Sequence, residues 1–141
     1  MKKQTIKSFL YTGLFFILFG FAALTTAADK DKTFNVSKGD NLEVSISNGN
    51  ISISTWEKEQ AYIKAINIED DDLQYLKIEQ QGNKVIVDFK GQDSDDFYLE
   101  ISIPSQFNLD LSTGGGNIAV KGNINGKVEV ATGGGNIALK D

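Results

Sequence analysis

The sequence predicts an all-β protein: a single domain with a repeated, solenoid-like architecture and Gly-rich corners, preceded by an N-terminal signal peptide. Beyond residue 33, apolar residues alternate with polar ones, which is the two-residue period of a β-strand. A strand, a Gly-rich turn and a second strand recur at an offset of 19 residues. No segment has a clear 3.6-residue period, and 141 residues are too few for more than one ordinary domain.

The first 27 residues have the three-part layout of a secretory signal peptide. A basic start with Lys2, Lys3 and Lys7 precedes an uncharged, mostly apolar run over residues 9–24, and small residues follow at 25–28. The run has 16 residues, fewer than the roughly 20 that span a bilayer, so the pattern favours cleavage over a retained membrane anchor.

We therefore expect cleavage after Ala27 or Ala28, a short polar linker over residues 28–33, and a folded domain over residues 34–141. The mature protein would be secreted or periplasmic, at the cell envelope, with no membrane insertion after cleavage. Retention of the N-terminal segment as an anchor is the alternative.

The composition excludes several classes of function. Without the three lysines of the signal, 11 of the 14 basic residues remain against 19 acidic ones, a net charge of −8, and none of them is arginine. Such a domain is a poor candidate for binding nucleic acid or an anionic lipid surface, which both attract basic patches. The absence of cysteine and histidine removes disulfides, the usual zinc, iron and copper ligands, and a histidine base for a serine nucleophile. We therefore expect that the protein is not an enzyme and holds no cofactor, with calcium as the one candidate.

The alternating segments are short and closely spaced, which is typical of all-β folds. Gly, Asn and Asp, the usual turn residues, occupy nearly every gap between them. Residues 70–78 fit either a helical turn or a strand. The expected strands lie at residues 42–46, 51–53, 85–89, 97–103, 109–111, 118–120, 128–130 and 137–139.

Two copies of the repeat, residues 109–120 and 128–139, share the sequence Thr-Gly-Gly-Gly-Asn-Ile-Ala, and residues 44–53 form a third, weaker copy. Each unit has one apolar face, which only a neighbouring unit can bury, so the copies are expected to stack. The stacked asparagines can form a hydrogen-bonded ladder. Stacking predicts three pairs: Ile118 on Ile137, Val120 on Leu139, and Asn117 on Asn136.

The turn of the upstream copy is expected to be two residues shorter than the other two turns. Ile46 and Ile51 are five residues apart, whereas Leu111 and Ile118 are seven apart. A difference of two keeps the same side chains facing inward, because side chains alternate between the two faces of a strand.

The Gly-rich turns are interpreted as corners of the fold and not as ligand loops. A phosphate-binding loop needs a helix after the glycines, and here a strand pattern follows. The calcium-binding nonapeptide repeat needs an Asp two residues after its third Gly, and this chain has Asn-Ile-Ala after that Gly, with no Asp. Glycine suits a corner because it allows a positive φ or a close approach of two backbones. The corner residues are Gly49, Asn50, Gly114, Gly115, Gly116, Asn117, Gly133, Gly134, Gly135 and Asn136.

Two acidic runs are candidate calcium sites, because clustered carboxylates on loops suit a hard cation. Neither run has the ligand spacing of an EF-hand loop, and charge runs usually keep a loop solvated, so solvated loops are the favoured interpretation. The candidate ligands are Asp70, Asp71, Asp72, Asp93, Asp95 and Asp96.

The aromatic residues suggest a sugar-binding face built on Trp56, with Tyr62, Tyr75 and Tyr98 as companions. Trp56 directly follows an expected strand, and large aromatic side chains are mostly buried. A cap on the end of the core is therefore the favoured interpretation of Trp56.

Several of these motifs occur in the order found in a known family. Residues 47–56, Ile103-Pro104 and residues 109–118 resemble the bacterial putative-adhesin family of β-strand-repeat domains and the related toast-rack domains. The resemblance covers most of residues 34–141 and implies a solenoid-like fold with a single sheet and corners, and an extracytoplasmic location, without catalytic residues. Family members tend to continue with more repeats. The domain is therefore expected either to be C-terminally truncated or to pair its last strand, near Leu139, with a partner.

The sequence thus predicts an exported, non-catalytic envelope or surface domain that acts as an adhesin-like structural or binding module. Its expected partner is a protein or glycan at the cell envelope, or a second copy that pairs with the C-terminal edge strand. One alternative is an extracytoplasmic sensory or regulatory domain of an envelope-stress system. The others are a weak glycan-active enzyme with a carboxylate pair and a calcium-binding module.

Overall fold

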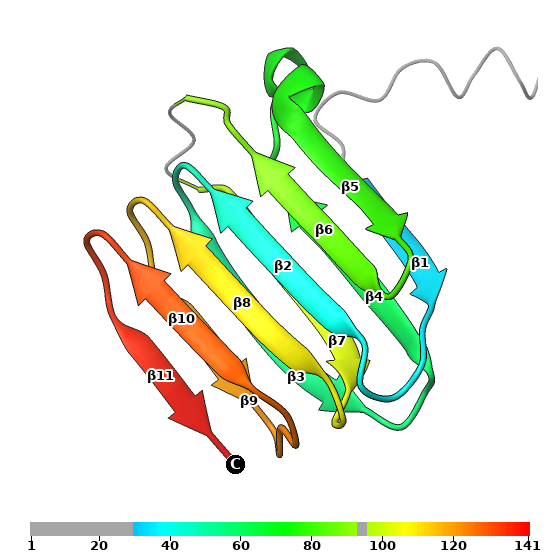
Figure 1. Cartoon of the computed structure of the whole chain (residues 1–141). Helices are drawn as coiled ribbons and strands as arrows, with labels where there is room; N and C mark the ends of the chain where they lie inside the picture. Colours follow the sequence, from blue (N-terminus) through cyan, green and yellow to red (C-terminus); the bar gives the residue numbers. More distant parts are fainter. Residues whose placement is uncertain (1–29, 93–95) are drawn as a thin grey trace, which may run out of the picture.

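The computed structural model describes residues 30–92 and 96–141. The predicted signal peptide and its cleavage site lie outside these residues. The described chain forms β-strands and one 3-10 helix, arranged as two sheets that pack face to face, which confirms the all-β prediction (Figure 1). The elements in chain order are β1 (Lys30–Asn35), β2 (Asn41–Ile46), β3 (Asn50–Trp56), β4 (Gln60–Ile66), η2 (Asp70–Tyr75), β5 (Leu76–Gln81), β6 (Lys84–Phe89), β7 (Tyr98–Pro104), β8 (Asn108–Thr113), β9 (Ile118–Lys121), β10 (Val128–Thr132) and β11 (Ile137–Lys140).

Both sheets are mixed, and their antiparallel pairs lie at one end of the molecule. Sheet A has the strand order β1-β4-β7-β3-β9-β11, and sheet B has the order β10-β8-β2-β6-β5. Among the described strands, β1 with β4, β4 with β7, and β5 with β6 are antiparallel, and the other pairs are parallel. In Figure 1, β10 and β11 lie at the end where the described chain stops, and β1 and β5 lie at the opposite end.

Four chain segments supply one strand to each sheet and run parallel to one another, and each of them is here called a layer: β6–β7, β2–β3, β8–β9 and β10–β11. The layers stack in that order, so the segment that comes first in the chain, β2–β3, lies between β6–β7 and β8–β9. A simple solenoid stacks each coil on the preceding one. Here the chain runs through the antiparallel strands β4 and β5 after β3, so the layer order differs from the chain order.

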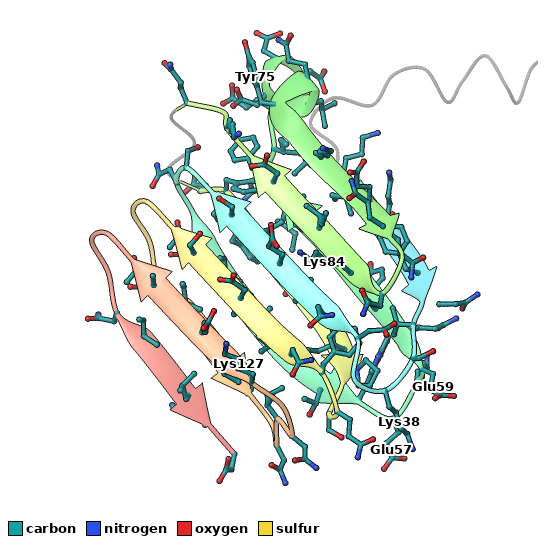
Figure 2. The ribbon with its side chains drawn as sticks, viewed as in Figure 1. Lys38, Glu57, Glu59, Tyr75, Lys84 and Lys127 are labelled. Atoms are coloured by element: carbon teal, nitrogen blue, oxygen red, sulfur yellow. The ribbon has the colours of Figure 1, made fainter. Side chains whose placement is uncertain are left out.

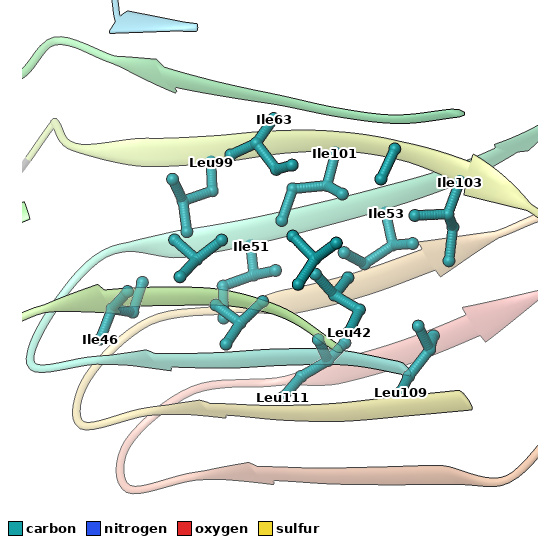
Figure 3. Packing of buried hydrophobic residues seen from close by; sticks show 14 of the residues in the cluster. Leu42, Ile46, Ile51, Ile53, Ile63, Leu99, Ile101, Ile103, Leu109 and Leu111 are labelled. Carbon is teal, nitrogen blue, oxygen red and sulfur yellow. The ribbon is translucent and has the colours of Figure 1, made fainter. Parts of the chain in front are cut away.

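The core lies between the two sheets. Alternate residues of each strand face inward; on β4, for example, Ala61, Ile63 and Ala65 are buried, and the residues between them are half-buried. Branched aliphatic side chains from both sheets meet there (Figure 3). Burying one such Ile or Leu side chain stabilises the fold by about 1.5–3 kcal/mol. This packing holds the layers in register.

The parallel register agrees with the stacking predicted for the two C-terminal copies. Ile137 lies opposite Ile118, and Leu139 lies opposite Val120. The two copies therefore stack directly, one layer apart.

The prediction of a shorter upstream turn is wrong. Ile46 lies opposite Thr113 and Ile51 lies opposite Ile118, so the two turns have the same length. Thr113 faces the core with 4% of its surface exposed, and its hydroxyl donates to the Gly49 carbonyl oxygen at 2.9 Å. This hydrogen bond satisfies the buried hydroxyl, so a polar side chain can occupy a core position. The sequence-based prediction considered only apolar residues and therefore did not include Thr113 in the core.

Three segments differ from the sequence-based picture or complete it. The expected linker over residues 28–33 is a strand from Lys30 onward, because β1 pairs with β4 along its whole length. Residues 70–78 contain both a helical turn and a strand, the two alternatives for this segment, since η2 is followed directly by β5 at Leu76. Strand β4 was not expected, because Ala61 and Ala65 weaken its apolar alternation.

One end of the stack, here named the closed end, comprises β1, β5 and η2. Side chains there cross between the two edge strands: Lys32 Nζ donates to the Ile78 carbonyl oxygen at 2.8 Å, and Gln80 Nε2 donates to the Asn35 carbonyl oxygen at 2.8 Å. These bonds tie sheet A to sheet B.

The other end, here named the open end, is the β10–β11 layer with its corner at residues 133–136. In the described chain, β10 and β11 each have a neighbouring strand on one side only. No helix within the described ranges has both the length and the apolar character that crossing a bilayer requires.

Candidate binding surface

The Gly-Asn corners connect sheet B to sheet A at residues 47–50, 114–117 and 133–136. Only Gly49 among their glycines has a positive φ, +122°. The glycines at 116 and 135 are required for a different reason. A Cβ on Gly116 would lie well under 3.0 Å from the Gly49 carbonyl oxygen, and a Cβ on Gly135 would meet the Gly116 carbonyl oxygen equally closely. Glycine at these places lets consecutive corners touch backbone to backbone.

Two rows of hydrogen bonds run along the corners from layer to layer. In the first row, the Thr113 hydroxyl donates to the Gly49 carbonyl oxygen, and the Thr132 hydroxyl donates to the Gly116 carbonyl oxygen at 2.7 Å. The β8–β9 layer therefore donates to the β2–β3 layer and accepts from the β10–β11 layer.

The second row is an asparagine ladder. Asn117 N donates to Asn50 Oδ1 at 2.8 Å, and Asn136 N donates to Asn117 Oδ1 at 2.9 Å. The stacked asparagines lie where the repeat predicts them, but the donor is the backbone N–H and not a neighbouring side-chain amide. The side-chain oxygens of Asn50 and Asn117 thus each accept a hydrogen bond from the next layer.

A second ladder, which the sequence analysis missed, lies at the opposite corner of the layers. Asn108 Nδ2 donates to Asn41 Oδ1 at 3.2 Å, and Lys127 N donates to Asn108 Oδ1 at 3.0 Å. The signal for it was present, because Asn41 and Asn108 each precede a Leu-acid-apolar triplet. This ladder ends at Lys127, which has no side-chain amide.

The open end carries the same corner without a following layer in the described chain. The Gly135 carbonyl oxygen and Asn136 Oδ1, which are the acceptors of the two rows, receive no hydrogen bond from described residues. Apolar side chains accompany them: Ile137 is 45% exposed and Leu139 is 60% exposed. A hollow of about 190 Å³ adjoins Leu139 and is lined further by Val120, Ile124 and Val128. Within the described residues, the open end therefore combines strand edges without a neighbour, acceptors that receive no hydrogen bond, and exposed apolar surface.

The outer face of sheet B carries three carboxylates in register. Glu43 lies beside Asp110, and Asp110 lies beside Glu129. Lys84 Nζ pairs with Glu43 at 3.0 Å, and Lys127 Nζ pairs with Glu129 at 3.1 Å (Figure 2). These side chains are largely exposed, so each pair contributes at most about 1 kcal/mol. The row is a solvated surface with balanced charge at its two ends.

Four of the six predicted calcium ligands are among the described residues. Asp70, Asp71 and Asp72 form the first turn of η2, and the Asp72 side chain lies beside Gly91. Asp96 is also described, whereas Asp93 and Asp95 lie outside the described residues. No group of three or more acidic side chains in the described chain is arranged to hold a metal ion. Calcium binding stays a prediction, and a thermal melt with and without millimolar calcium tests it: an unchanged melting temperature would contradict it.

Trp56 is held in place at the end of β3. Its Nε1 donates to the Gln60 carbonyl oxygen at 2.8 Å, Lys58 Nζ lies 4.8 Å from the ring centroid, and the Tyr62 ring lies 6.4 Å away. Tyr75 projects from η2 at the other end of the strands, far from Glu57 and Glu59 beside Trp56 (Figure 2). The four aromatic residues of the predicted sugar-binding face are therefore not gathered on one surface.

The comparisons with known proteins find similarity at the level of the fold. The chain matches no family model and no curated protein. It resembles the crystal structure of a putative cell adhesion protein from Clostridium sporogenes with a TM-score of 0.56 and 17% identity, over 79% of this chain and 61% of that one. Putative adhesins from Bacteroides fragilis and Parabacteroides merdae are more distant, with TM-scores of 0.46 and 0.42, identities of 12% and 14%, and coverage of 78% and 80% of this chain. The chain spans about 61% of the length of the first two and 58% of the third. The chain shares an all-β fold with the first of these structures, but it has two mixed sheets and not the single sheet with corners that the resemblance in sequence implied.

Proposed function

We propose that this protein is an exported, non-catalytic module of the cell envelope or cell surface, with an adhesin-like role, that binds its partner at the open end. The single observation that carries the proposal is the β10–β11 layer, where Ile137 and Leu139 are exposed beside strand edges that lack a neighbour in the described chain. Exposed edges of this kind recruit an extended segment of another chain. The signal-like N-terminus and a fold shared with a putative cell adhesion protein support the location and the role.

Binding at this end would follow the physics of strand addition. Backbone hydrogen bonds along β10 and β11 would provide affinity, and apolar side chains on alternate positions would provide selectivity. The rest of the described surface is mostly solvated and charged, as on the outer face of sheet B. The open end is the region where burial of apolar surface would accompany binding.

A non-catalytic role is supported by the chemistry that the chain offers. It has no histidine and no cysteine to act as base or nucleophile. Two hollows on its surface, of about 190 Å³ at sheet B and about 320 Å³ beside Trp56, are lined mainly by polar and charged side chains. Ligand pockets are usually lined mainly by apolar side chains.

Cell fractionation with N-terminal sequencing tests the location. We expect a protein outside the cytoplasm that starts near Asp29. An intact N-terminus in the membrane fraction would instead favour the sensory alternative, because a sensor needs a route to the cytoplasm. A cytoplasmic protein that still begins at Met1 would overturn the proposal.

Adhesion of the purified domain to intact cells of its own species tests the binding surface. We expect that Leu139→Lys, which places a charge on the open end, reduces retained protein by at least tenfold. The matched control is Tyr75→Lys at the closed end, where the tyrosine is 49% exposed and lies outside the proposed surface. Equal retention of both variants would exclude the open end as the binding surface.

A further inference from the structure

We propose that the open end binds an extended segment of the same repeat type as the chain itself: an apolar strand, then Thr-Gly-x-Gly-Asn, then a second apolar strand. This segment would lie on β10–β11 as a further layer in parallel register. The inference rests on the proposed function, because it names the chemistry of the partner at that surface.

The direction of the hydrogen bonds identifies the partner. At both existing corner contacts, a threonine hydroxyl and an asparagine N–H of the later layer donate to a glycine carbonyl and an asparagine Oδ1 of the earlier one. The β10–β11 layer repeats these two acceptors as Gly135 O and Asn136 Oδ1. A segment with threonine and asparagine in the same spacing would supply both donors.

The glycines of the partner follow from the close approach of the corners. At the first and third corner positions, a Cβ on the later layer would meet a backbone carbonyl oxygen of the earlier layer; this holds for Gly114 and Gly116 and again for Gly133 and Gly135. At the middle position the restriction is absent, since a Cβ on Gly134 would meet no atom within 4 Å. The third position is therefore selective for glycine, and the middle position is not.

The apolar side chains of the partner follow from the burial of equivalent residues. Ile118 and Val120, which a later layer covers, are 0% and 2% exposed, whereas Ile137 and Leu139 are 45% and 60% exposed. An isoleucine or leucine at the same places of an added segment would cover Ile137 and Leu139 in the same way. The opposite corner contributes less, because its asparagine ladder ends at Lys127.

A second folded copy of this protein fits the open end less well. In such a copy the donors of the 113–117 and 132–136 corners are already engaged with the preceding layer. Two open ends brought together by a two-fold axis would place acceptors against acceptors. An unfolded segment of the repeat type, with its donors free, meets neither obstacle.

Peptide binding to the mature protein provides the first test. The probe is a peptide with the sequence of residues 128–140, and two matched control peptides carry alanine at the third or at the middle glycine. We expect saturable binding that shifts the amide resonances of β10 and β11, binding at least tenfold weaker for alanine at the third glycine, and little change for alanine at the middle one. Equal binding of the two control peptides would overturn the proposal.

Variants of the protein test the acceptor. Asn136→Asp keeps an oxygen at the place of Oδ1, whereas Asn136→Leu removes it. We expect that the first binds the peptide and the second binds it at least tenfold more weakly. Equally strong peptide binding by both variants would show that Asn136 Oδ1 does not accept a hydrogen bond from the segment, and would contradict the proposal.

A tethered segment removes the limit that weak affinity sets, because attachment raises its effective concentration into the millimolar range. Residues 122–140 are repeated directly after Lys140, with and without alanine at the third glycine of the added copy. For the chain whose added copy keeps all three glycines, we expect a higher melting temperature and protection of the Ile137 and Leu139 amides from hydrogen exchange. We expect neither effect for the chain with alanine at the third glycine. An unprotected added copy would sink the inference even if peptide affinity is too low to measure.

The two proposals fail separately. If Leu139→Lys abolishes adhesion but the tethered copy does not dock, the open end binds a partner of other chemistry, and only this inference is wrong. If the tethered copy docks but adhesion is unaffected by Leu139→Lys, the proposed function at this surface is wrong.

Discussion

The edge strands at the two ends of the molecule differ in their direction and in their side-chain contacts. At the closed end the strand direction reverses, and β1 and β5 run antiparallel to their neighbours. Side chains then bridge the two edges, as Lys32 does to Ile78. At the open end the last layer repeats the corner and the register of the layer before it. A stack of parallel layers is thus stopped by reversed strands, whereas repetition leaves it able to continue.

The largest expected contrast concerns burial in the middle and at the open end. Ile53 is fully buried in the β2–β3 layer, so Ile53→Ala removes buried apolar volume and should lower the free energy of unfolding by about 2–5 kcal/mol. Leu139 is 60% exposed, and Leu139→Ala should change it by less than about 0.5 kcal/mol. Urea denaturation measures both. Equal losses would mean that the end layer is as well packed as the middle.

The corner glycines give a second contrast. Gly116→Ala forces a Cβ against the Gly49 carbonyl between two layers and should lower the free energy of unfolding by about 1–3 kcal/mol. Gly135→Ala creates the same clash in the end layer, which can move away, so the loss in global stability should be smaller. Gly134→Ala, which meets no atom, should stay within about 0.5 kcal/mol of the wild type. Thermal or urea melts of the three variants provide the comparison, and a larger loss for Gly134→Ala would refute the close-approach explanation.

The asparagine ladder offers a smaller effect of the same kind. Asn117→Ala removes the acceptor for the Asn136 N–H and should lower the free energy of unfolding by about 1 kcal/mol. Asn136→Ala removes an acceptor that no described residue uses, so stability should hardly change. Hydrogen exchange of the Asn136 amide should rise in the first variant and remain unchanged in the second. Equal destabilisation would indicate that the side chains matter for a reason other than this ladder.

The smallest effect concerns the closed end and high pH. Partial burial and the hydrogen bond to the Asp31 carboxylate, at 3.1 Å, raise the pKa of Tyr62 above its usual value of ~10. Below pH ~10 both the folded and the unfolded state carry the neutral phenol, so the contribution to stability is fully present. It is lost as the pH rises through the raised pKa of the folded state. Melting curves between pH 9 and pH 11 should therefore show a decline that is weaker in Tyr62→Phe, and a decline of the same size in that variant would assign it to other groups.

The repeated part of the fold could be predicted from sequence because its signals are local. Period-two alternation and the identical Thr-Gly-Gly-Gly-Asn-Ile-Ala motifs indicate the strands, the corners and the contact of Ile118 with Ile137. The inward position of Thr113 was not predicted, because it depends on a hydrogen bond to Gly49, 64 residues away in the chain. Local patterns do not contain such a partner.

The order of the layers and the closed end could not be predicted for a related reason. The choice of β6 and β8 as the neighbours of β2 is set by packing among segments far apart in the chain. β4 was missed because its buried alanines look neutral in a hydropathy pattern. At the candidate site, the sequence indicated an edge near Leu139, whereas the free acceptors at Gly135 and Asn136 required the geometry of the preceding corners.

The position of the β2–β3 layer has a consequence for the time at which the protein can fold. This layer is synthesised early, yet both of its neighbours come later, and the bond between Asn50 and Asn117 joins residues 67 apart in the chain. Contacts between such distant residues form slowly, because the entropy of closing the long loops must be overcome first. The middle of the stack therefore cannot be completed until the chain has been made to about Lys121, and β10–β11 can then add as a rapid local step over 19 residues. The chain should accordingly remain unfolded through most of its synthesis.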